Sequence, residues 1–302
     1  MNQQFLTELK AVTAENRIFT DEPMKKHTTF RVGGPADILV QPKGTELAAV
    51  IRLCRKYDVP YQVIGNGSNL LVGDRGIRGL VIEMLSKEDE ICVEDDCITV
   101  GAGMLLSKTA NRAAEHGLTG MEFAAGIPGS IGGAVVMNAG AYGGEMKDIL
   151  TAVTVLDQEG NEKILSAEEL ELGYRTSCIL KKGYIVTGAK IKLKHGEETA
   201  IRARMEELKK QRVEKQPLEY PSAGITFKRP EGYFAGKLIM DAGLRGYLVG
   251  EAQVSEKHCG FVINRGNATA ADVRTLMQNV ADIVEEKFGV RLEPEVKMIG
   301  EF

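Results

Sequence analysis

The chain has 302 residues, of which 43% are hydrophobic and 26% are charged, and its formal net charge is −4. These values are typical of a globular protein of one or two domains, and the slightly acidic balance argues against a nucleic-acid or membrane partner. The five cysteines include no C-x-x-C pair, and no signal peptide is visible, so we expect a reduced cytoplasmic protein. Cys92 and Cys97 have no histidine near them in the sequence, so we expect no metal site there.

The first half of the chain is predicted to alternate short helices and strands. Residues 3–14 have the spacing of an amphipathic helix. A second helix is expected over 45–57, with Thr45 as its N-cap, and a third over 104–116, ending at Gly117. The strands of this half are expected at 36–40, 61–64, 70–72, 79–84 and 97–100.

The second half is predicted to hold two long helices. One covers 197–215, where the many charges form a solvated face, and the other covers 270–288 with apolar residues in helical register. Ser166, followed three residues later by Glu169, has the pattern of a capping box and predicts a short helix. The remaining strands are expected at 152–157, 184–193, 259–263 and 296–299.

The elements suggest an N-terminal appendage followed by two domains. We divide the chain into residues 1–26, 27–195 and 196–302. No G-x-G-x-x-G follows a predicted strand, and no G-x-x-x-x-G-K-[ST] occurs, so the Rossmann and P-loop interpretations lose their main support.

The stretch 120–144 is the most unusual part of the sequence, with eight glycines among its 25 residues and no charge from Phe123 to Gly144. Pro128, Asn138 and the scattered glycines argue against a membrane span, and the apolar residues between them argue against a flexible linker. A buried loop remains, whose backbone N–H groups could hold phosphate. Because residues 65–69 have the same character, we expect a large cofactor that carries phosphate.

Six motifs in order then resemble one family. They are IGNGSNLLVGDRGIRGLVI (64–82), GIPGSIGGAVVMNAGAYGGE (126–145), YRTS (174–177), PSAGITFKRP (221–230), GKLIMDAG (236–243) and LEPEVKMIG (292–300). This set resembles the UDP-N-acetylenolpyruvoylglucosamine reductases, over nearly the whole chain. The short connection after Tyr174 resembles the compact form of the family, which lacks an extra loop. The resemblance implies an α+β fold, with a vanillyl-alcohol-oxidase-type FAD-binding domain at 27–195 and a smaller α+β substrate-binding domain at 196–302.

The resemblance also implies a reaction. NADPH would give a hydride to a non-covalently bound FAD, and the reduced flavin would pass it to the enolpyruvyl group of a UDP-sugar, making UDP-N-acetylmuramate for bacterial peptidoglycan. We expect a monomer in the bacterial cytoplasm. The expected FAD-binding residues are Ile64, Gly65, Asn66, Gly67, Ser68, Asn69, Leu70, Gly126, Ile127, Pro128, Gly129, Ser130, Gly132, Gly133, Ala134, Asn138, Ala139 and Gly140.

The catalytic and substrate-binding residues follow from the same resemblance. Arg175 and Glu295 occupy the positions of the cation and the acid that face the substrate carboxylate. From the residues alone, Arg175 would be interpreted as a surface ion pair and Glu295 as a solvent-facing strand residue. The expected substrate-binding residues are Tyr174, Arg175, Lys228, Arg229 and Lys237. The histidines at 27, 116 and 258 are interpreted as structural.

The sequence departs from the family pattern at the proton donor, because Ile225 stands where the family has serine or cysteine. Met240, Leu248 and Val136 also stand where we expect glutamine, arginine and an aromatic residue. An isoleucine side chain has no proton to donate. Three hypotheses follow: the family's reductase with a displaced donor such as Thr226 or a water, a flavoprotein with an impaired or more apolar pocket, and a non-catalytic FAD-binding protein.

Overall fold

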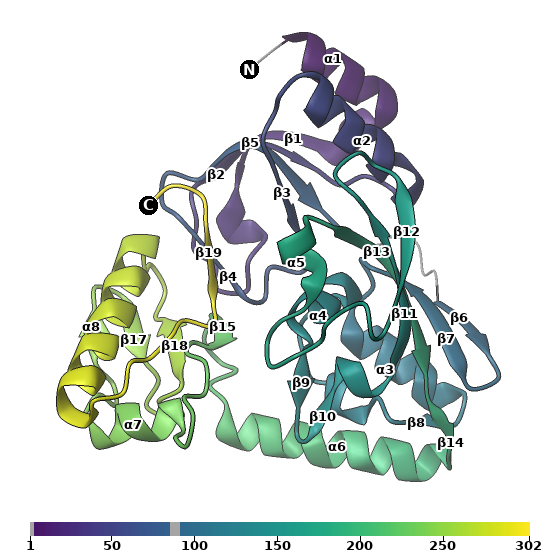
Figure 1. The fold of residues 1–302 in the computed structure, drawn as a ribbon. Helices are drawn as coiled ribbons and strands as arrows, with labels where there is room; N and C mark the ends of the chain where they lie inside the picture. The colour runs from purple at the N-terminus through teal and green to yellow at the C-terminus, as the bar shows by residue number, and fades with distance from the viewer. Residues whose placement is uncertain (1–2, 85–90) are drawn as a thin grey trace. The chain divides into compact units, whose positions relative to one another are not determined.

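The computed structural model describes residues 3–84 and 91–302 (Figure 1). The chain forms two compact units that are interleaved in the sequence. The first unit consists of residues 1–19, 38–66 and 79–212, and the second consists of residues 20–37, 67–78 and 213–302. A division by compactness does not decide where domains begin and end, so the contiguous domains predicted from the sequence stay a prediction.

In the first unit, two helices lie side by side at the N-terminal end of the chain (Figure 1). They are α1 (Gln3–Val12) and α2 (Gly44–Lys56), and their buried residues share a core with β3 and β5. The chain also forms a four-stranded sheet of order β1-β2-β5-β3, with β1 (Ile18–Pro23), β2 (Pro35–Val40), β5 (Ile77–Glu83) and β3 (Tyr61–Ile64). Short 3-10 turns lie at Glu15–Arg17 and Met24–Lys26. The helices and strands predicted here are confirmed to within a few residues.

The predicted N-cap of α2 is wrong. The cap is Lys43, whose backbone N–H donates to the Glu46 carboxylate at 2.9 Å. Because Glu46 satisfies this amide from inside the first turn, the helix begins before Thr45 and needs no hydroxyl at that position.

A second, larger core in the first unit is built on an antiparallel sheet of order β12-β11-β13-β7-β6. Helices α3 and α4 pack against it. The strands and helices of this part are β6 (Ile91–Glu94), β7 (Cys97–Gly101), α3 (Leu106–Glu115), β8 (Leu118–Thr119), α4 (Ile131–Met137), β9 (Gly140–Ala141), β10 (Gly144–Glu145), β11 (Leu150–Leu156), β12 (Glu162–Ser166), α5 (Cys178–Lys182), β13 (Ile185–Lys192) and β14 (Lys194–His195). Further 3-10 turns lie at Glu122–Ala124 and Met146–Asp148.

The short helix predicted from Ser166 is absent, since residues 167–171 form turns. The capping contacts themselves are present: the Ser166 N–H donates to the Glu169 carboxylate at 2.8 Å, and the Glu169 N–H donates to the Ser166 hydroxyl at 3.3 Å. Glu171, two residues after Glu169, has a left-handed backbone with φ of 50°. A left-handed residue ends a helical turn, so the box closes a single turn and nothing more.

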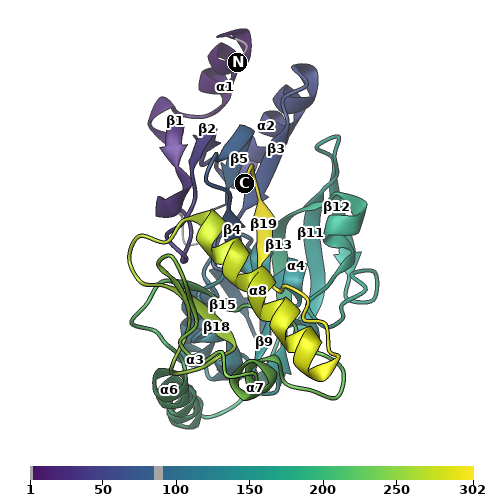
Figure 2. The same cartoon turned by 90° about the vertical axis from the view of Figure 1, so that its left-hand side faces the viewer.

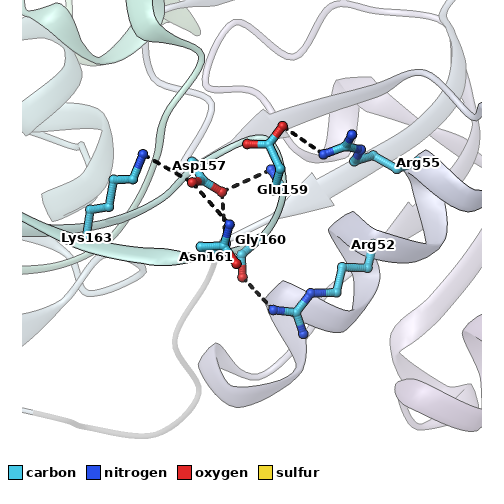
Figure 3. A network of polar contacts seen from close by, with 7 residues as sticks. All are labelled: Arg52, Arg55, Asp157, Glu159, Gly160, Asn161 and Lys163. Carbon is cyan, nitrogen blue, oxygen red and sulfur yellow. Dashed lines mark hydrogen bonds and ion pairs between the residues drawn. The ribbon is translucent and has the colours of Figure 1, made fainter.

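The hairpin turn between β11 and β12 is tied to α2 by a polar network (Figure 3). One oxygen of Asp157 accepts hydrogen bonds from the N–H groups of Glu159 at 3.0 Å and Asn161 at 2.9 Å. Lys163 lies 3.2 Å from the other oxygen. The hydrogen bond from the backbone N–H of Asn161 is the main cause that lowers the pKa of Asp157 to about 2. Arg52 of α2 donates to the Gly160 carbonyl at 2.9 Å and completes the connection.

We expect Asp157→Asn to lower the midpoint of thermal unfolding at neutral pH, because an amide cannot accept these bonds as a charged carboxylate does. The folded pKa of Asp157 is depressed, so its contribution is present above the unfolded value near 4 and is lost as pH falls through about 2. The gap between wild type and variant, measured by circular dichroism from pH 7 to pH 2, should therefore close toward pH 2. Glu162→Gln on the exposed start of β12 is the control, and an equal gap at every pH would contradict the assignment.

The long helix α6 (Glu198–Lys215) is confirmed (Figure 1). Its exposed faces carry ion pairs within the helix, Arg202 with Glu198 at 2.7 Å and Arg204 with Glu207 at 2.7 Å. Ile201 and Leu208 are buried, whereas Val213 is 53% exposed. The buried side of this helix therefore ends before its last turn.

The second unit is an antiparallel sheet with α8 lying across it (Figure 2). The sheet has the order β15-β18-β17-β16, and a separate parallel pair joins β19 to β4. The elements are β4 (Leu70–Val72), β15 (Ser222–Ile225), α7 (Ala235–Asp241), β16 (Leu248–Val249), β17 (Ala252–Val254), β18 (Phe261–Asn264), α8 (Ala270–Phe288) and β19 (Lys297–Ile299). Helix α8 has the predicted bounds, with a capping box of Thr269 and Asp272.

The α+β fold class is confirmed. All five cysteines are free. No helix within residues 3–84 and 91–302 has both the length and the apolar character needed to cross a bilayer. The same residues contain no cluster of three or more histidine, cysteine, aspartate or glutamate side chains suited to a metal ion.

Candidate functional site

In the first unit, the residues after β3 lie beside the glycine-rich loop. The Asn66 side-chain amide donates to the Pro128 carbonyl at 2.6 Å. A Cβ added to Gly65 would lie 2.1 Å from the hydroxyl oxygen of Ser130, so no larger residue fits there. Within the described residues, the N–H groups of Gly65 and Asn66 donate no hydrogen bond. Glycine at 65 therefore lets the backbone approach Ser130 of the same protein closely. The N–H groups of Gly65 and Asn66 remain available to a ligand.

The glycine-rich loop leads directly into α4. Ser130 is the N-cap, and its hydroxyl accepts from the Gly133 N–H at 3.4 Å. The N–H groups of Ile131 and Gly132 donate to carbonyls of the preceding segment, Met104 and Ala102, at 2.8 Å each. Among the described residues, the N–H groups at 126 and 129 have no acceptor. The loop is thus held by some of its amides and leaves others for a ligand.

The C-terminal end of α4 holds the segment 173–177 through three hydrogen bonds, which we call the 136–177 clamp. The Ser177 hydroxyl donates to the Val136 carbonyl at 2.8 Å, and the Asn138 amide donates to the Gly173 carbonyl at 3.0 Å. The Arg175 guanidinium donates to the Gly140 carbonyl at 3.2 Å. Three bonds from positions 136, 138 and 140 thus hold the segment on both sides of Tyr174, and one of them holds the Arg175 guanidinium itself.

Asn138 is fully buried, and its side chain makes hydrogen bonds besides the one in the clamp. Its side chain also donates to Glu145 at 2.7 Å and accepts from the Lys147 N–H at 2.9 Å. Its φ of 42° and the φ of 53° at Arg175 are left-handed values that few non-glycine residues adopt. Strained backbone at both ends of one hydrogen-bonded clamp indicates that the position of Arg175 is determined by its surroundings. Tyr174, next to it, is 55% exposed.

In the second unit, Gly67 is held against the backbone. Its φ is 58°, and an added Cβ would lie 2.0 Å from the His27 carbonyl oxygen. The N–H of Ser68 donates to no described residue. The Asn69 carbonyl accepts from the Lys297 N–H at 2.9 Å, and Leu70 pairs with Lys297 in the parallel β4–β19 ladder.

The expected proton-donor position lies on β15, which has an irregular register against β18. Gly224 has a φ of 77°, and the register shifts between Ser222 and Ile225. Ile225 therefore pairs with Phe261 of β18. The neighbouring Thr226 is 1% exposed, and its hydroxyl accepts from the Val262 N–H at 2.9 Å.

The charged residues expected to act on or bind the substrate differ in their burial and in their contacts. Glu295 is 8% exposed, and its N–H donates to the Thr226 carbonyl at 2.8 Å, which joins the last motif to the strand of Ile225. Lys228 pairs with Glu293 at 2.9 Å and Lys237 pairs with Asp241 at 2.7 Å. The Arg229 guanidinium stacks on the Phe234 ring at 4.0 Å.

Three further residues depart from the expected pattern or were missed from sequence. Met240 and Leu248, at positions expected to be polar, are 41% and 50% exposed. The Met240 sulfur accepts from Arg245 at 3.2 Å. Arg212 of α6 lies against Gly126, and no motif pointed to it because it stands in a run of charged residues.

A hollow of about 470 Å³ lies on the first unit's five-stranded sheet, between residues of β6, β7, β11 and β13. Cys92 and Thr99 are among its lining residues. None of the residues expected to bind cofactor or substrate lines it.

The chain matches two family models. Residues 36–166 match "FAD binding domain", and residues 216–299 match "UDP-N-acetylenolpyruvoylglucosamine reductase, C-terminal domain". A protein of Agathobacter rectalis named "UDP-N-acetylenolpyruvoylglucosamine reductase" is 57% identical, with both chains covered completely. The chain belongs to the UDP-N-acetylenolpyruvoylglucosamine reductase family. It is therefore an oxidoreductase with an FAD-binding domain, and its cofactor is FAD.

Other reductases of the family agree with this assignment. A Clostridium perfringens protein of the same name is 53% identical over 99% of each chain. The crystal structure of the Thermus caldophilus reductase superposes with a TM-score of 0.77 at 40% identity, covering 91% of this chain and 97% of that one. An alkyldihydroxyacetonephosphate synthase, at 15% identity and a TM-score of 0.51, covers 98% of this chain and 61% of its own and shares the fold alone.

Two glycines of the reductase allow a test of the cofactor loops. We expect Gly67→Val to lower both flavin content and the unfolding temperature, because a side chain there meets the His27 carbonyl and a disfavoured φ. Gly133→Ala should not lower the unfolding temperature, since the added Cβ meets only the Ser130 hydroxyl at an ordinary 3.5 Å and alanine favours the helix more than glycine does. Flavin absorbance per chain and thermal unfolding are the measurements. A Gly67→Val protein with full flavin and wild-type stability would contradict this reason for the glycine.

Proposed function

We propose that the chain reduces UDP-N-acetylenolpyruvoylglucosamine to UDP-N-acetylmuramate with NADPH, as a monomer in the bacterial cytoplasm. The observation that carries the proposal is the 57% identity with a reductase of that name over the complete length of both chains. Bound non-covalently, FAD supplies the hydride chemistry that no protein side chain provides.

The residues of the predicted cofactor set suit a diphosphate. In the first unit, the N–H groups of Gly65, Asn66, Gly126 and Gly129 have no acceptor among the described residues. Unpaired amides of this kind are the donors that turn-rich phosphate sites use. We propose that these amides, together with residues 67–70 and 130–140, hold the cofactor. Asn138 contributes through its backbone and its position, because its side chain is already committed to the clamp.

We propose that Arg175 and Glu295 act on the substrate carboxylate. Addition of hydride to the enolpyruvyl double bond moves negative charge onto that carboxylate, and a fixed cation stabilises this charge. The 136–177 clamp supports this role, because the Arg175 guanidinium is held by the Gly140 carbonyl. Glu295 is 8% exposed and its backbone is held by the Thr226 carbonyl, so we propose it as the acid that faces the carboxylate. Tyr174, Lys228, Arg229 and Lys237 are proposed to bind the UDP-sugar.

A second candidate function is favoured by Ile225. Isoleucine has no proton to give to the carbon next to the carboxylate, and Thr226 is bound to the backbone of β18. The exposed side chains of Met240 and Leu248 add apolar surface where polar side chains are expected. The alternative is a flavoprotein on this scaffold with impaired native activity or a more apolar substrate, and a non-catalytic FAD protein is the last possibility.

One preparation tests these functions together. Acid precipitation of one portion of the purified protein should release the flavin into the supernatant. In a second, untreated portion, NADPH oxidation is followed with and without UDP-N-acetylenolpyruvoylglucosamine. Oxidation that requires this substrate supports the reductase, and oxidation with oxygen alone supports the altered flavoprotein. Protein with flavin but no NADPH oxidation at all would leave only the non-catalytic reading.

A further inference from the structure

Helix α6 contains one arginine that lacks the ion pair its neighbours make. Arg202 and Arg204 pair with glutamates three or four residues away. The positions three and four residues from Arg212 hold Leu208, Lys209, Lys215 and Gln216. None of these is acidic, so Arg212 has no carboxylate on its own helix with which to form an ion pair. In the part of the chain that the structure describes, no hydrogen bond or ion pair reaches its guanidinium.

The unpaired guanidinium is also partly buried. Built on Gly126, a Cβ would lie 3.2 Å from the Arg212 Cδ and 3.5 Å from its Nη1, so the side chain lies flat against the glycine-rich loop. Burial lowers the pKa of the Arg212 guanidinium, and Tyr142 on the same loop acts in the opposite direction. The loop offers no counter-charge, because no acidic residue occurs between Phe123 and Gly144. Removing a charge from water without a partner is unfavourable, which points to a partner supplied from outside the chain.

We propose that Arg212 binds the diphosphate of a nucleotide ligand, together with the N–H group of Gly126. A guanidinium donates two parallel hydrogen bonds to a phosphate, and the Gly126 amide beside it has no acceptor among the described residues. A glycine at 126 leaves room for this arrangement, since any side chain would press on the arginine. The choice of phosphate rests on the proposed function, in which FAD and the UDP-sugar both carry a diphosphate.

The test compares three substitutions in the full-length protein. Arg212→Met keeps the apolar stem and removes the charge. Arg212→Lys keeps the charge but not the paired N–H donors of the guanidinium. Arg202→Met is the control, because it removes an arginine whose guanidinium is paired with Glu198. Dissociation constants are measured for FAD with apoprotein and for UDP with holoprotein, the second with inorganic pyrophosphate as competitor. We expect Arg212→Met to weaken one of the two ligands by about tenfold or more, Arg212→Lys to weaken it less, and Arg202→Met to change neither.

The two arms identify the source of the diphosphate. A loss confined to FAD assigns Arg212 to the cofactor, and a loss confined to UDP assigns it to the sugar nucleotide. Constants within twofold of wild type for both ligands, in an Arg212→Met protein that unfolds at the wild-type temperature, would overturn the proposal and leave a packing role. If that variant does not fold, Arg212→Lys and Arg212→Gln decide by the same criterion. Wild-type protein that binds no UDP would contradict the proposed substrate, while the FAD arm would still decide the role of Arg212.

Discussion

Ile225→Ser is expected to increase turnover of UDP-N-acetylenolpyruvoylglucosamine at least about tenfold, because a positioned general acid contributes roughly 10²–10⁴-fold to a rate. The structure places Ile225 at the end of β15, where a backbone irregularity at Gly224 sets its direction. Serine at this position restores an O–H donor without changing that backbone. The increase should appear in the reoxidation of reduced flavin by substrate, and flavin reduction by NADPH should stay the same. Stopped-flow flavin absorbance separates the two.

Thr226→Val is the matched control for this prediction. Its hydroxyl accepts from the Val262 N–H, so its removal should lower stability by about 1–3 kcal/mol and leave turnover unchanged. A large loss of turnover in Thr226→Val would identify Thr226 as the working donor. Wild-type protein that already turns over rapidly, with no change in Ile225→Ser, would contradict the prediction.

Arg175→Ala and Glu295→Gln are expected to slow reoxidation of the flavin by substrate about 10²–10³-fold, the usual effect of removing one group that stabilises a developing oxyanion. Flavin reduction by NADPH should be unaffected, because that step creates no charge on the enolpyruvyl carboxylate. Arg175→Lys should recover part of the rate, since it retains the charge but not the geometry of the guanidinium.

Glu293→Gln is the control for Glu295, since it removes a carboxylate two residues away whose side chain is 70% exposed and pairs with Lys228. Its reoxidation rate should match wild type. Slower bleaching of the flavin by NADPH in either Arg175→Ala or Glu295→Gln would assign these residues to the nicotinamide side of the reaction.

Most helices and strands were predictable because their hydrophobic spacing is regular. Helix α8 has the predicted bounds, since its apolar stripe, its Thr269 cap and its terminal glycine all agree. The helix predicted at Ser166 was wrong although its capping contacts form, because the backbone is already left-handed at Glu171 and the turn ends there. Local pattern predicts an element where every local signal agrees, and it fails where packing decides how far the element continues.

The candidate site was only partly predictable for a similar reason. The glycine-rich loops are recognisable by composition, but the sequence does not reveal that a side chain at 65 would collide with Ser130. Asn138 was expected to contact cofactor, and its role in the 136–177 clamp depends on hydrogen bonds to residues far along the chain. Arg212 was missed because the sequence shows only that it has no acidic neighbour on its helix, whereas its burial against Gly126 depends on how the helix meets the loop.

The pairing of β19 with β4 has a consequence for the order of synthesis. Leu70 emerges from the ribosome long before its partner Lys297, because most of the chain lies between them. Until then one edge of β4 lacks its neighbour, which leaves unpaired backbone groups open to other strands. Because ordering so long an intervening chain is slow, closure of this ladder is a late event in biogenesis. A nascent chain stalled before residues 297–299 are translated would therefore carry an open β edge and be a substrate for chaperones.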